Sequence, residues 1–349
     1  MAELAWKGKQ RIQSGLSGYE QSTTSSPYQL ITKEMHAPPS TDAQPSPHAA
    51  DNWYNRLILG DKDRTLPALL AEFAGSVNLI YIDPPFMTGR TFTGGPQGEQ
   101  IAYSDTWNND IDTYLQWLYD TFTLLYALLA TTGSLYVHLD WRVCHYAKIV
   151  LDEIFGFNPR GEGPGFKNEI IWHYQSGGNF QKYYARKHDV ILLYTKSAQY
   201  CFHGERVARR RGAHKRNHMR KEIGPDGRVL WTIRSGGRTY SYHEDTTMAP
   251  SDVWSDISRL HQRDPERVGY ATQKPATLLE RIILTSSEEH DLVLDCFCGS
   301  GVTPVVADRN ERRWIACDQS ELAIALTNQR LTQKDFNHPF VLQQVIADI

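Results

Sequence analysis

Residues 79–86, Leu-Ile-Tyr-Ile-Asp-Pro-Pro-Phe, place a carboxylate, two prolines and an aromatic ring directly after an apolar run. The run at residues 77–82 has the length and the β-branched content of a buried strand. Neither proline can donate a backbone hydrogen bond, and Pro85 forces Pro84 into an extended conformation. Because ligands bind at the carboxyl edge of an open α/β sheet, the pattern predicts a stiff loop that presents Asp83 to a ligand. Taken alone, the tetrapeptide could equally be only a turn that ends a strand.

A second stretch, residues 292–318, has the order strand, glycine loop, helix and strand. The expected elements are a strand at 292–295, a loop at 296–301 (Cys-Phe-Cys-Gly-Ser-Gly), a helix at 302–310 and a strand at 314–317 that ends at Asp318. Glycines allow a ligand to approach the backbone at a helix N-terminus, and an acid about 20 residues further on suits the hydroxyl pair of a ribose. Pro304 stands where the dinucleotide fingerprint has its third glycine. The pattern therefore favours an adenosyl ligand without a pyrophosphate over a nicotinamide cofactor.

Together the two stretches resemble the amino-methyltransferases that act on exocyclic amines of DNA bases. Asp-Pro-Pro-Phe at 83–86 is similar to their catalytic motif, and Asp295 with Phe-Cys-Gly-Ser-Gly at 297–301 is similar to their S-adenosylmethionine loop. Because the catalytic motif comes first, the chain resembles the circularly permuted β group, which includes type III modification subunits and solitary adenine methyltransferases. The resemblance runs from about Asn55 to Leu331. It implies an α/β, Rossmann-like, S-adenosylmethionine-dependent methyltransferase fold, circularly permuted, with an inserted target-recognition region.

The resemblance also assigns roles to single residues. It implies catalytic roles for Asp83, Pro84, Pro85 and Phe86. It implies that the cofactor, S-adenosylmethionine, is held by Asp61, Lys274, Asp295, Phe297, Cys298, Gly299, Ser300, Gly301 and Asp318. The family has a Gly-Asp near the adenine ring, matched by Asp61, and a Gln-Lys-Pro near the methionine end, matched by Lys274. From the residues alone, Asp61 could instead lead a helix and Lys274 could be solvated.

The catalytic motif suits the chemistry of an exocyclic amine, which is a poor nucleophile because its lone pair is delocalised into the ring. Two acceptors, the Asp83 carboxylate and the Pro84 carbonyl, can bind its hydrogens and free that lone pair, and Asp83 can take or relay the proton. The methyl donor is already activated as a sulfonium, so alignment does most of the remaining work. Phe86 would stack on the base, a contact worth about 1–3 kcal/mol. A base inside a duplex must first be flipped out.

The first residue of the catalytic motif bears on which base is methylated. Families that act on cytosine N4 mostly carry serine there, and those that act on adenine N6 mostly carry aspartate, as Asp83 does. The resemblance therefore implies site-specific methylation of the N6 amine of a flipped-out adenine in double-stranded DNA. Four alternatives stay open: N4-cytosine methylation, methylation of RNA or of a protein side-chain amide, a nucleic-acid-binding module without activity, and a nicotinamide oxidoreductase.

A basic cluster between residues 206 and 221 contains no acid. A charge run is usually a solvated face, but a polyanionic substrate makes phosphate contact the better interpretation here. The predicted DNA-binding residues are Arg206, Arg209, Arg210, Arg211, Lys215 and Arg216. A homodimer and a restriction-system partner are further partners that the resemblance allows.

Composition indicates a reducing compartment and no membrane. The five cysteines, at 144, 201, 296, 298 and 317, form no disulfide-like framework. No apolar stretch is long enough to span a membrane, and no basic-then-apolar leader opens the sequence. Cys296 and Cys298 lack a histidine pair at metal spacing, so no metal site is expected. We therefore expect a cytoplasmic protein, associated with the nucleoid of a prokaryote.

Composition and pattern divide the chain into five segments. These are a flexible N-terminal tail or surface arm (1–50, with Trp6 as its anchor), the catalytic half (51–198), the target-recognition region (199–267), the cofactor-binding half (268–335) and a C-terminal extension (336–349). Residues 88–110 are expected to be a long polar loop that closes over DNA or cofactor. His138 is expected to be structural rather than a general base. Strand-like pieces at 229–233 and 238–242 are expected to form a hairpin.

Overall fold

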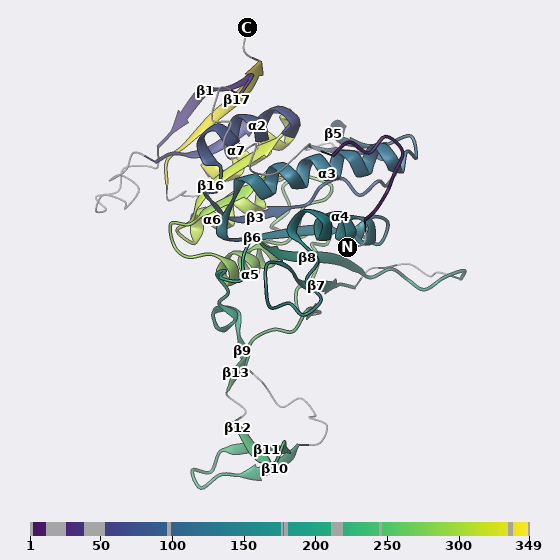
Figure 1. The fold of residues 1–349 in the computed structure, drawn as a ribbon. Coiled ribbons are helices and arrows are strands. Elements are labelled where there is room, and N and C mark those ends of the chain that lie inside the picture. Colours follow the sequence, from purple (N-terminus) through teal and green to yellow (C-terminus); the bar gives the residue numbers. More distant parts are fainter. Residues whose placement is uncertain are drawn as a thin grey trace. The chain divides into compact units, whose positions relative to one another are not determined.

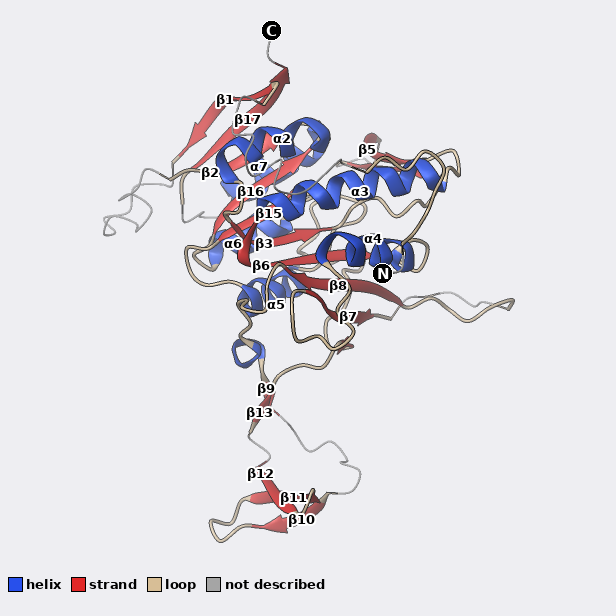
Figure 2. Ribbon diagram, in the orientation of Figure 1, coloured by secondary structure: helices blue, strands red, loops and turns tan. Residues whose placement is uncertain are grey.

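The computed structural model describes residues 3–11, 26–37, 53–95, 99–175, 177, 181–210, 219–243, 246–333 and 338–347. The chain forms two compact units (Figures 1 and 2). The inserted unit is Phe202–Ser251, and the main unit combines Met1–Cys201 with Asp252–Ile349. None of the described helices is both long enough and apolar enough to cross a membrane.

The main unit is built on one large sheet, to which the described residues contribute ten strands. In spatial order these are β1 (Tyr28–His36), β17 (Phe340–Ala347), β2 (Asn55–Leu59), β16 (Arg313–Asp318), β15 (Leu292–Asp295), β3 (Val77–Ile82), β6 (Leu129–Leu139), β8 (His188–Thr195), β7 (Gly165–His173) and β14 (Val253–Trp254). From β17 to β6 each strand pairs in parallel with the next, whereas β8 runs antiparallel to both β6 and β7. A mostly parallel sheet of this kind is apolar on both faces and must be covered on both.

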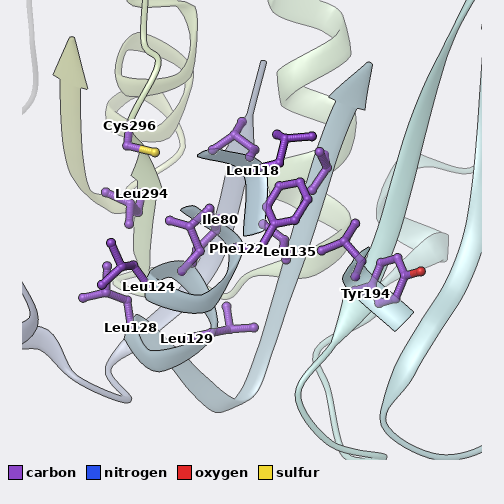
Figure 3. Close-up of a cluster of buried hydrophobic side chains, with 14 of the residues drawn as sticks. Ile80, Leu118, Phe122, Leu124, Leu128, Leu129, Leu135, Tyr194, Leu294 and Cys296 are labelled. Carbon is purple, nitrogen blue, oxygen red and sulfur yellow. The ribbon is translucent and has the colours of Figure 1, made fainter. Parts of the chain in front are cut away.

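Helices cover the two faces of the sheet (Figure 2). One face carries α2 (Lys62–Phe73), α3 (Ile111–Leu128) and α4 (Cys144–Phe155), and the other carries α5 (Ala276–Ser286), α6 (Val302–Arg309) and α7 (Glu321–Gln333). Successive strand residues alternate between the faces, so Ile80 joins the first buried cluster while its neighbours Leu79 and Tyr81 join the second. Figure 3 shows part of the first cluster, with Leu118 and Phe122 from α3.

The helices begin where side chains or backbone conformation satisfy their first turn. The carboxylate of Asp61 accepts a hydrogen bond from the N–H of Asp63 at 2.7 Å and caps α2. Asp110 caps α3 in the same way. Helix α6 begins at Gly301, whose left-handed conformation (φ 71°) favours glycine. Two of these starts, at Asp61 and Gly301, were predicted site residues, so the same positions shape the helices and the loops that precede them.

The chain connections reverse direction between β15 and β3, which are neighbours in the sheet. From β15 the chain crosses through α6 to β16 on one side, and from β3 it passes through α3 to β6 on the other. The loops after β15 and β3 therefore leave the sheet side by side at a topological switch point, where open α/β sheets bind ligands. The register pairs Val293 with Leu79. The predicted catalytic motif and the predicted glycine loop thus meet at one edge.

Two segments in which no strand was predicted form neighbouring strands at one end of the sheet. Residues 28–36 of the expected N-terminal tail form β1, which pairs antiparallel with β17 of the expected C-terminal extension. Trp6 is buried, as its expected anchoring role requires, and donates a hydrogen bond to Oε1 of Gln116 at 3.2 Å. The sequence did not predict β1 because this strand exposes most of its side chains and so has the composition of a surface. Residues 12–25 and 38–50 of the predicted tail lie outside the described residues.

The segment expected to be a long loop, residues 88–110, contains a hairpin. Strand β4 (Arg90–Gly94) pairs antiparallel with β5 (Gln100–Asp105). Phe92 of β4 stacks on Tyr103 of β5 with ring centroids 4.8 Å apart, and Tyr103 stacks on Tyr270 at 6.5 Å. The prediction of an irregular loop was wrong here because two short, polar strands carry little apolar signal, and packing on Tyr270 supplies what the local sequence lacks.

The inserted unit contains the predicted hairpin. Strand β11 (Val229–Ser235) pairs antiparallel with β12 (Arg238–His243) and with β10 (Arg220–Ile223). The turn lies at Gly236-Gly237, where both residues have positive φ, 56° and 76°. A second antiparallel pair joins β9 (Arg209–Arg210) to β13 (Thr247–Met248), and the short 3-10 helix η2 (Gly204–Val207) precedes it. The predicted hairpin is therefore confirmed.

Candidate active site

A cavity of about 310 Å³ lies where the loops after β3 and β15 meet. Its lining contains these predicted site residues: Asp61, Asp83, Pro85, Lys274, Asp295, Phe297, Cys298, Gly299, Ser300 and Asp318. Pro84, Phe86 and Gly301 belong to the same loops but not to the lining. The fold therefore gathers the predicted catalytic and cofactor residues around one space.

The two carboxylate oxygens of Asp83 differ in their partners. Oδ2 forms an ion pair with Nζ of Lys274. Oδ1 is buried and accepts no hydrogen bond from any described residue. A buried acceptor left without a donor costs about 1–3 kcal/mol, and this one belongs to a residue that lines the cavity, where a ligand could supply the donor. The N–H group of an amine is a donor of this kind.

Lys274 lines the cavity and is paired with Asp83. It was expected to meet the carboxylate of the cofactor, which stays a prediction. In this structure its Nζ is paired with Asp83 and lies 5.5 Å from the ring centroid of Phe86. The sequence could not show this contact, because the two residues are 191 positions apart. The ammonium therefore fixes one oxygen of the Asp83 carboxylate.

His138 is fully buried next to the predicted catalytic loop, residues 83–88, and is held from both sides. Its Nδ1 lies 2.9 Å from the hydroxyl of Tyr81, and its Nε2 lies 3.2 Å from Oδ2 of Asp189. Burial alone would raise the pKa of Asp189, but the hydrogen bond and charge of His138 lower it below its ordinary value. The ring of Phe86 packs against His138 with centroids 6.1 Å apart. His138 does not line the cavity, so this geometry agrees with the predicted structural role.

The loop after Asp83 is held by two residues that were not among the predicted site residues, Tyr114 and Asp105. The hydroxyl of Tyr114 donates a hydrogen bond to the carbonyl of Pro85 at 2.7 Å. The carboxylate of Asp105 accepts hydrogen bonds from the backbone N–H groups of residues 86–88. Asp105 ends the β4–β5 hairpin, in the segment that the sequence predicted to be an irregular loop, and Tyr114 lies in the first turn of α3.

The glycine loop after β15 is held by the two acids that flank it. Oδ1 of Asp295 accepts a hydrogen bond from the N–H of Phe297 at 3.0 Å, and its Oδ2 accepts one from the hydroxyl of Thr303. Oδ2 of Asp318 accepts a hydrogen bond from the N–H of Gly299 at 2.9 Å. Each carboxylate and the backbone N–H group that donates to it therefore hold each other in place.

Burial raises the pKa of both acids, because an ionised carboxylate loses hydration inside the protein. The pKa of Asp295 rises to about 7 and that of Asp318 to about 6, and in each case hydrogen bonds from neighbouring groups oppose the rise. A ligand that donates hydrogen bonds or carries positive charge favours the ionised form. The two acids are thus suited to hydroxyl groups and to cations.

Aromatic side chains from distant segments complete the cavity. Trp117 of α3 packs against Phe297 with ring centroids 5.5 Å apart, and Nζ of Lys62 lies 4.8 Å from the Trp117 ring. On another side, Tyr103 of the hairpin stacks on Tyr270, and burial raises the pKa of both phenols. Of these five residues only Phe297 was predicted to be in the site. Lys62 and Tyr270 stand close in sequence to the Gly-Asp at 60–61 and the Gln-Lys-Pro at 273–275, so proximity to those motifs is the signal that could have found them.

The lining fits S-adenosylmethionine by the chemistry of its donors and acceptors. Its charged residues are Asp61, Lys62, Asp83, Lys274, Asp295 and Asp318. Both lysines are paired with neighbouring carboxylates, so the remaining acids give the cavity an acidic balance. This balance suits ribose hydroxyls, an ammonium and a sulfonium, and the aromatic rings offer a surface for an adenine. When bound, S-adenosylmethionine supplies a methyl group that is activated for transfer to a nucleophile.

The predicted DNA-binding residues lie in the inserted unit where they are described. Arg206 lies in η2 and Arg209 in β9, and both side chains are exposed, as contact with a phosphate requires. Arg210 also lies in β9. Arg211, Lys215 and Arg216 lie outside the described residues. Their contact with DNA stays a prediction.

Comparison with known proteins gives a family and a fold. Residues 77–329 match the family model N6_N4_Mtase, described as DNA methylase. The chain is similar to the DNA adenine methyltransferase YhdJ of Escherichia coli (strain K12), with 27% identity over 277 residues that cover 79% of this chain and 82% of that protein. It is also similar to the Mod subunit of the type III restriction-modification enzyme StyLTI of Salmonella typhimurium, with 24% identity over 367 residues that cover 81% of this chain and 54% of that protein.

Among solved structures, the chain resembles TTHA0409 of Thermus thermophilus, described as a DNA modification methylase and solved in complex with S-adenosyl-L-methionine. The TM-score is 0.51 and the identity 19%, and the match covers 83% of this chain and 97% of the other. Together with the mostly parallel sheet covered by helices on both faces, this likeness confirms the predicted Rossmann-like methyltransferase fold.

Proposed function

The chain belongs to the DNA methylase family of S-adenosylmethionine-dependent methyltransferases, and we propose that it methylates the N6 amine of a flipped-out adenine at specific sites in double-stranded DNA. The observation that carries the proposal is Oδ1 of Asp83, a buried acceptor without a donor among the described residues, at the cavity that Asp295 and Asp318 also line. An amine hydrogen is the donor that this oxygen lacks. The families that act on adenine also mostly carry an aspartate at this position.

In the proposed mechanism, the protein acts on the amine through two acceptors. Oδ1 of Asp83 and the carbonyl of Pro84 accept the two amine hydrogens, which frees the nitrogen lone pair for attack on the methyl group. Lys274 holds Oδ2 of the same carboxylate and so fixes its orientation. Asp83 then takes or relays the proton that the methylated amine releases. Phe86, whose ring packs on His138, is proposed to stack its other face on the base.

We propose the cofactor site on the glycine loop and its flanking acids. Asp318, at the end of β16, is assigned to the ribose hydroxyls, and Asp61 to the adenine side of the cavity. The backbone at 297–301 is assigned to the methionine end, where glycines permit close approach. Lys274 lines the same cavity, so we propose that its ammonium, which is paired with Asp83, also lies near the carboxylate of the cofactor.

We propose that the domains divide the work as the sequence suggested. The inserted unit, Phe202–Ser251, lies within the proposed target-recognition region 199–267, and its arginines are assigned to DNA phosphates. The catalytic half (51–198) and the cofactor half (268–335) build the main unit. The late strand–helix–strand unit of the chain, β15 to β16, lies between the early strands β2 and β3, and this order supports the proposal that the fold is circularly permuted.

We further propose that the protein works in the cytoplasm of a prokaryote. Cys144, Cys296, Cys298 and Cys317 are free thiols, which suits a reducing compartment. A homodimer and a restriction-system partner stay proposals without an assigned surface.

A transfer assay tests the proposed function. Purified protein would be incubated with S-adenosylmethionine carrying a labelled methyl group and with plasmid DNA, RNA or protein as separate acceptors. We expect label in DNA alone, and none when Asp83→Ala replaces the wild type. Label in RNA or protein without label in DNA would contradict the proposal.

A further inference from the structure

We infer that Asp105 is a positioning residue for methyl transfer: its buried carboxylate fixes the loop at residues 85–88, and through it the acceptor pair of Asp83 and Pro84. The inference rests on the proposed function, because it assigns to Asp105 a part in the same reaction. Asp105 is the last residue of β5 and follows Phe86 by 19 positions. It lines no part of the cavity and is fully buried. It therefore acts through other residues rather than on a ligand.

The contacts of Asp105 converge on the catalytic loop. Oδ2 accepts hydrogen bonds from the N–H of Phe86 at 3.2 Å and from the N–H and hydroxyl of Thr88 at 2.8 and 2.7 Å. Oδ1 accepts hydrogen bonds from the N–H of Met87 at 2.9 Å and from Nε1 of Trp107 at 3.0 Å. Three consecutive backbone N–H groups thus point at one carboxylate, in the manner of an anion-binding nest.

The loop needs this carboxylate because its conformation is strained. Met87 has a φ of 59°, in the left-handed region that residues other than glycine seldom adopt. Such a conformation persists only when its surroundings over-determine it. Within the described part of the chain Asp105 has no cationic partner, so these five hydrogen bonds are what compensate its buried charge. The strained turn and the buried charge therefore depend on each other.

A second contact holds the other end of the same loop. The hydroxyl of Tyr114 donates to the carbonyl of Pro85 at 2.7 Å, and the ring of Trp107 packs edge-on against Tyr114 with centroids 5.0 Å apart. Trp107 also donates to Asp105. Asp105, at the end of the hairpin, and Tyr114 of α3 thus hold the loop at residues 86–88 and at Pro85. The carbonyl of Pro84, the proposed acceptor, lies between these contacts and the end of β3.

These contacts affect the reaction through the alignment of the reacting groups. A displacement of about 1 Å in a reacting group can lower a rate by about 100-fold, and the Pro84 carbonyl moves with the loop that Asp105 holds. The cofactor acids stand on β15 and β16 and do not touch Asp105. Loss of Asp105 should therefore slow methyl transfer while cofactor binding persists.

Asp105→Asn is the direct test, since the amide keeps the size but turns an NH₂ group toward backbone donors. We expect kcat to fall about 100-fold, with KM for S-adenosylmethionine and the Kd for DNA within about 3-fold of wild type. Thr88→Val removes one hydrogen bond to Oδ2 and should give a smaller fall in kcat with the same unchanged KM. Because Thr88 is only half-buried, this variant carries the test if Asp105→Asn does not fold.

Asp110→Asn is the matched control. Asp110 is also a carboxylate that accepts backbone N–H bonds, those of Asp112 and Thr113, but it caps α3 and does not touch the catalytic loop. Its variant should keep the wild-type kcat. Wild-type kcat in Asp105→Asn and Thr88→Val, a loss of cofactor affinity equal to the loss of rate, or an equal fall in Asp110→Asn would overturn the inference. Wild-type protein without transfer to DNA would instead refute the proposed function.

Discussion

The carboxylates around the cavity fall into two kinds at the scale of single residues. Asp83 is paired with an ammonium through one oxygen. Asp295 and Asp318 accept hydrogen bonds from neutral backbone and hydroxyl donors in their described contacts, and burial raises their pKa. This difference suggests a division of labour in which the acid after β3 serves the amine and the acids after β15 and β16 serve the cofactor.

Two alanine variants test that division. Asp83→Ala should abolish methyl transfer and leave cofactor affinity within a few-fold, because the residue faces the base. Asp318→Ala should weaken cofactor binding by about 1–3 kcal/mol, the value of a hydrogen bond to a charged group. Calorimetric titration with S-adenosylmethionine and the transfer assay measure the two effects separately. The reverse pattern, with binding lost in the first variant and kept in the second, would show that the two sites are wrongly assigned.

Asp318 should also make cofactor binding depend on pH. Burial raises its pKa from 3.8 to about 6 in the free protein, and only the ionised form accepts fully from ribose hydroxyls. Cofactor affinity should therefore fall as the pH is lowered through about 6, by at most about tenfold per pH unit. The stability of the free protein depends on pH in the opposite sense. Between about pH 4 and about pH 6 the folded state holds a proton that the unfolded state has released. This group thus lowers the free energy of unfolding as pH rises through that window.

The control for the pH dependence is Asp318→Asn, which cannot ionise. Its cofactor affinity should be weaker than that of the wild type at neutral pH and should lack the step near pH 6. Titrations between about pH 5 and about pH 8 measure both proteins. A wild-type affinity that does not change across this range would contradict the assignment of Asp318.

The sequence predicted the residues that stand in continuous motifs and missed those that only the fold brings near. Asp83, Asp295 and Asp318 could be named because each ends an apolar strand. Asp105 and Tyr114 could not, because their partners are backbone groups of a loop far from them in sequence. The physical reason is that a hydrogen bond to a main-chain group leaves no pattern in the side chains of its partner.

At the scale of elements, the glycine loop depends on the backbone conformation of Gly301. Gly301 begins α6 with a φ of 71°, and a Cβ placed there would lie 2.5 Å from Cγ2 of Thr327. Gly301→Ala should therefore destabilise the protein by about 2–4 kcal/mol, from the left-handed conformation and from overpacking. It should also weaken cofactor binding, since it displaces the loop. Urea unfolding measures the first effect and calorimetry the second.

Gly75→Ala separates the two causes. Gly75 also has a positive φ, 66°, but a Cβ there meets nothing within 4 Å. Its variant should lose only about 1–2 kcal/mol, the cost of the left-handed conformation, and should bind the cofactor as the wild type does. Equal losses of stability in the two variants would contradict the role given to the contact with Thr327.

The sequence predicted the buried strands but not the exposed ones. The predicted strands at 77–82 and 292–295 match β3 and β15, because a strand buried on both faces is a continuous apolar run. Strand β1 and the β4–β5 hairpin were missed, because their side chains are largely exposed and their stability comes from partners such as β17 and Tyr270. Pairing of this kind is a property of the fold rather than of the local composition.

At the scale of the whole molecule, the predicted enzyme class, fold and cofactor are confirmed by the family match over residues 77–329 and by the fold. They could be predicted because two motifs and their order specify them. The target sequence could not be predicted, since the region expected to recognise it, residues 199–267, carries no transferable motif. The role of that unit therefore stays a prediction.

The basic cluster of the inserted unit can be tested through salt dependence. Replacing Arg209, Arg210 and Arg211 with alanine should weaken DNA binding and reduce the slope of log K against log salt by about 0.9 per lost phosphate contact. Arg228→Ala is the control, since Arg228 is exposed in the same unit but paired with Asp226 at 2.6 Å. An unchanged slope in the triple variant would show that the cluster is only a solvated face.

The central claim is that the cavity transfers a methyl group to the N6 amine of adenine through Asp83. The most direct test is to express the protein in a host without DNA methylation, digest its DNA to nucleosides and resolve the methylated nucleosides by mass. We expect N6-methyldeoxyadenosine in the digest, and none in the digest from cells that express Asp83→Ala. N4-methylcytosine without N6-methyladenine, or N6-methyladenine that persists in Asp83→Ala, would contradict this account.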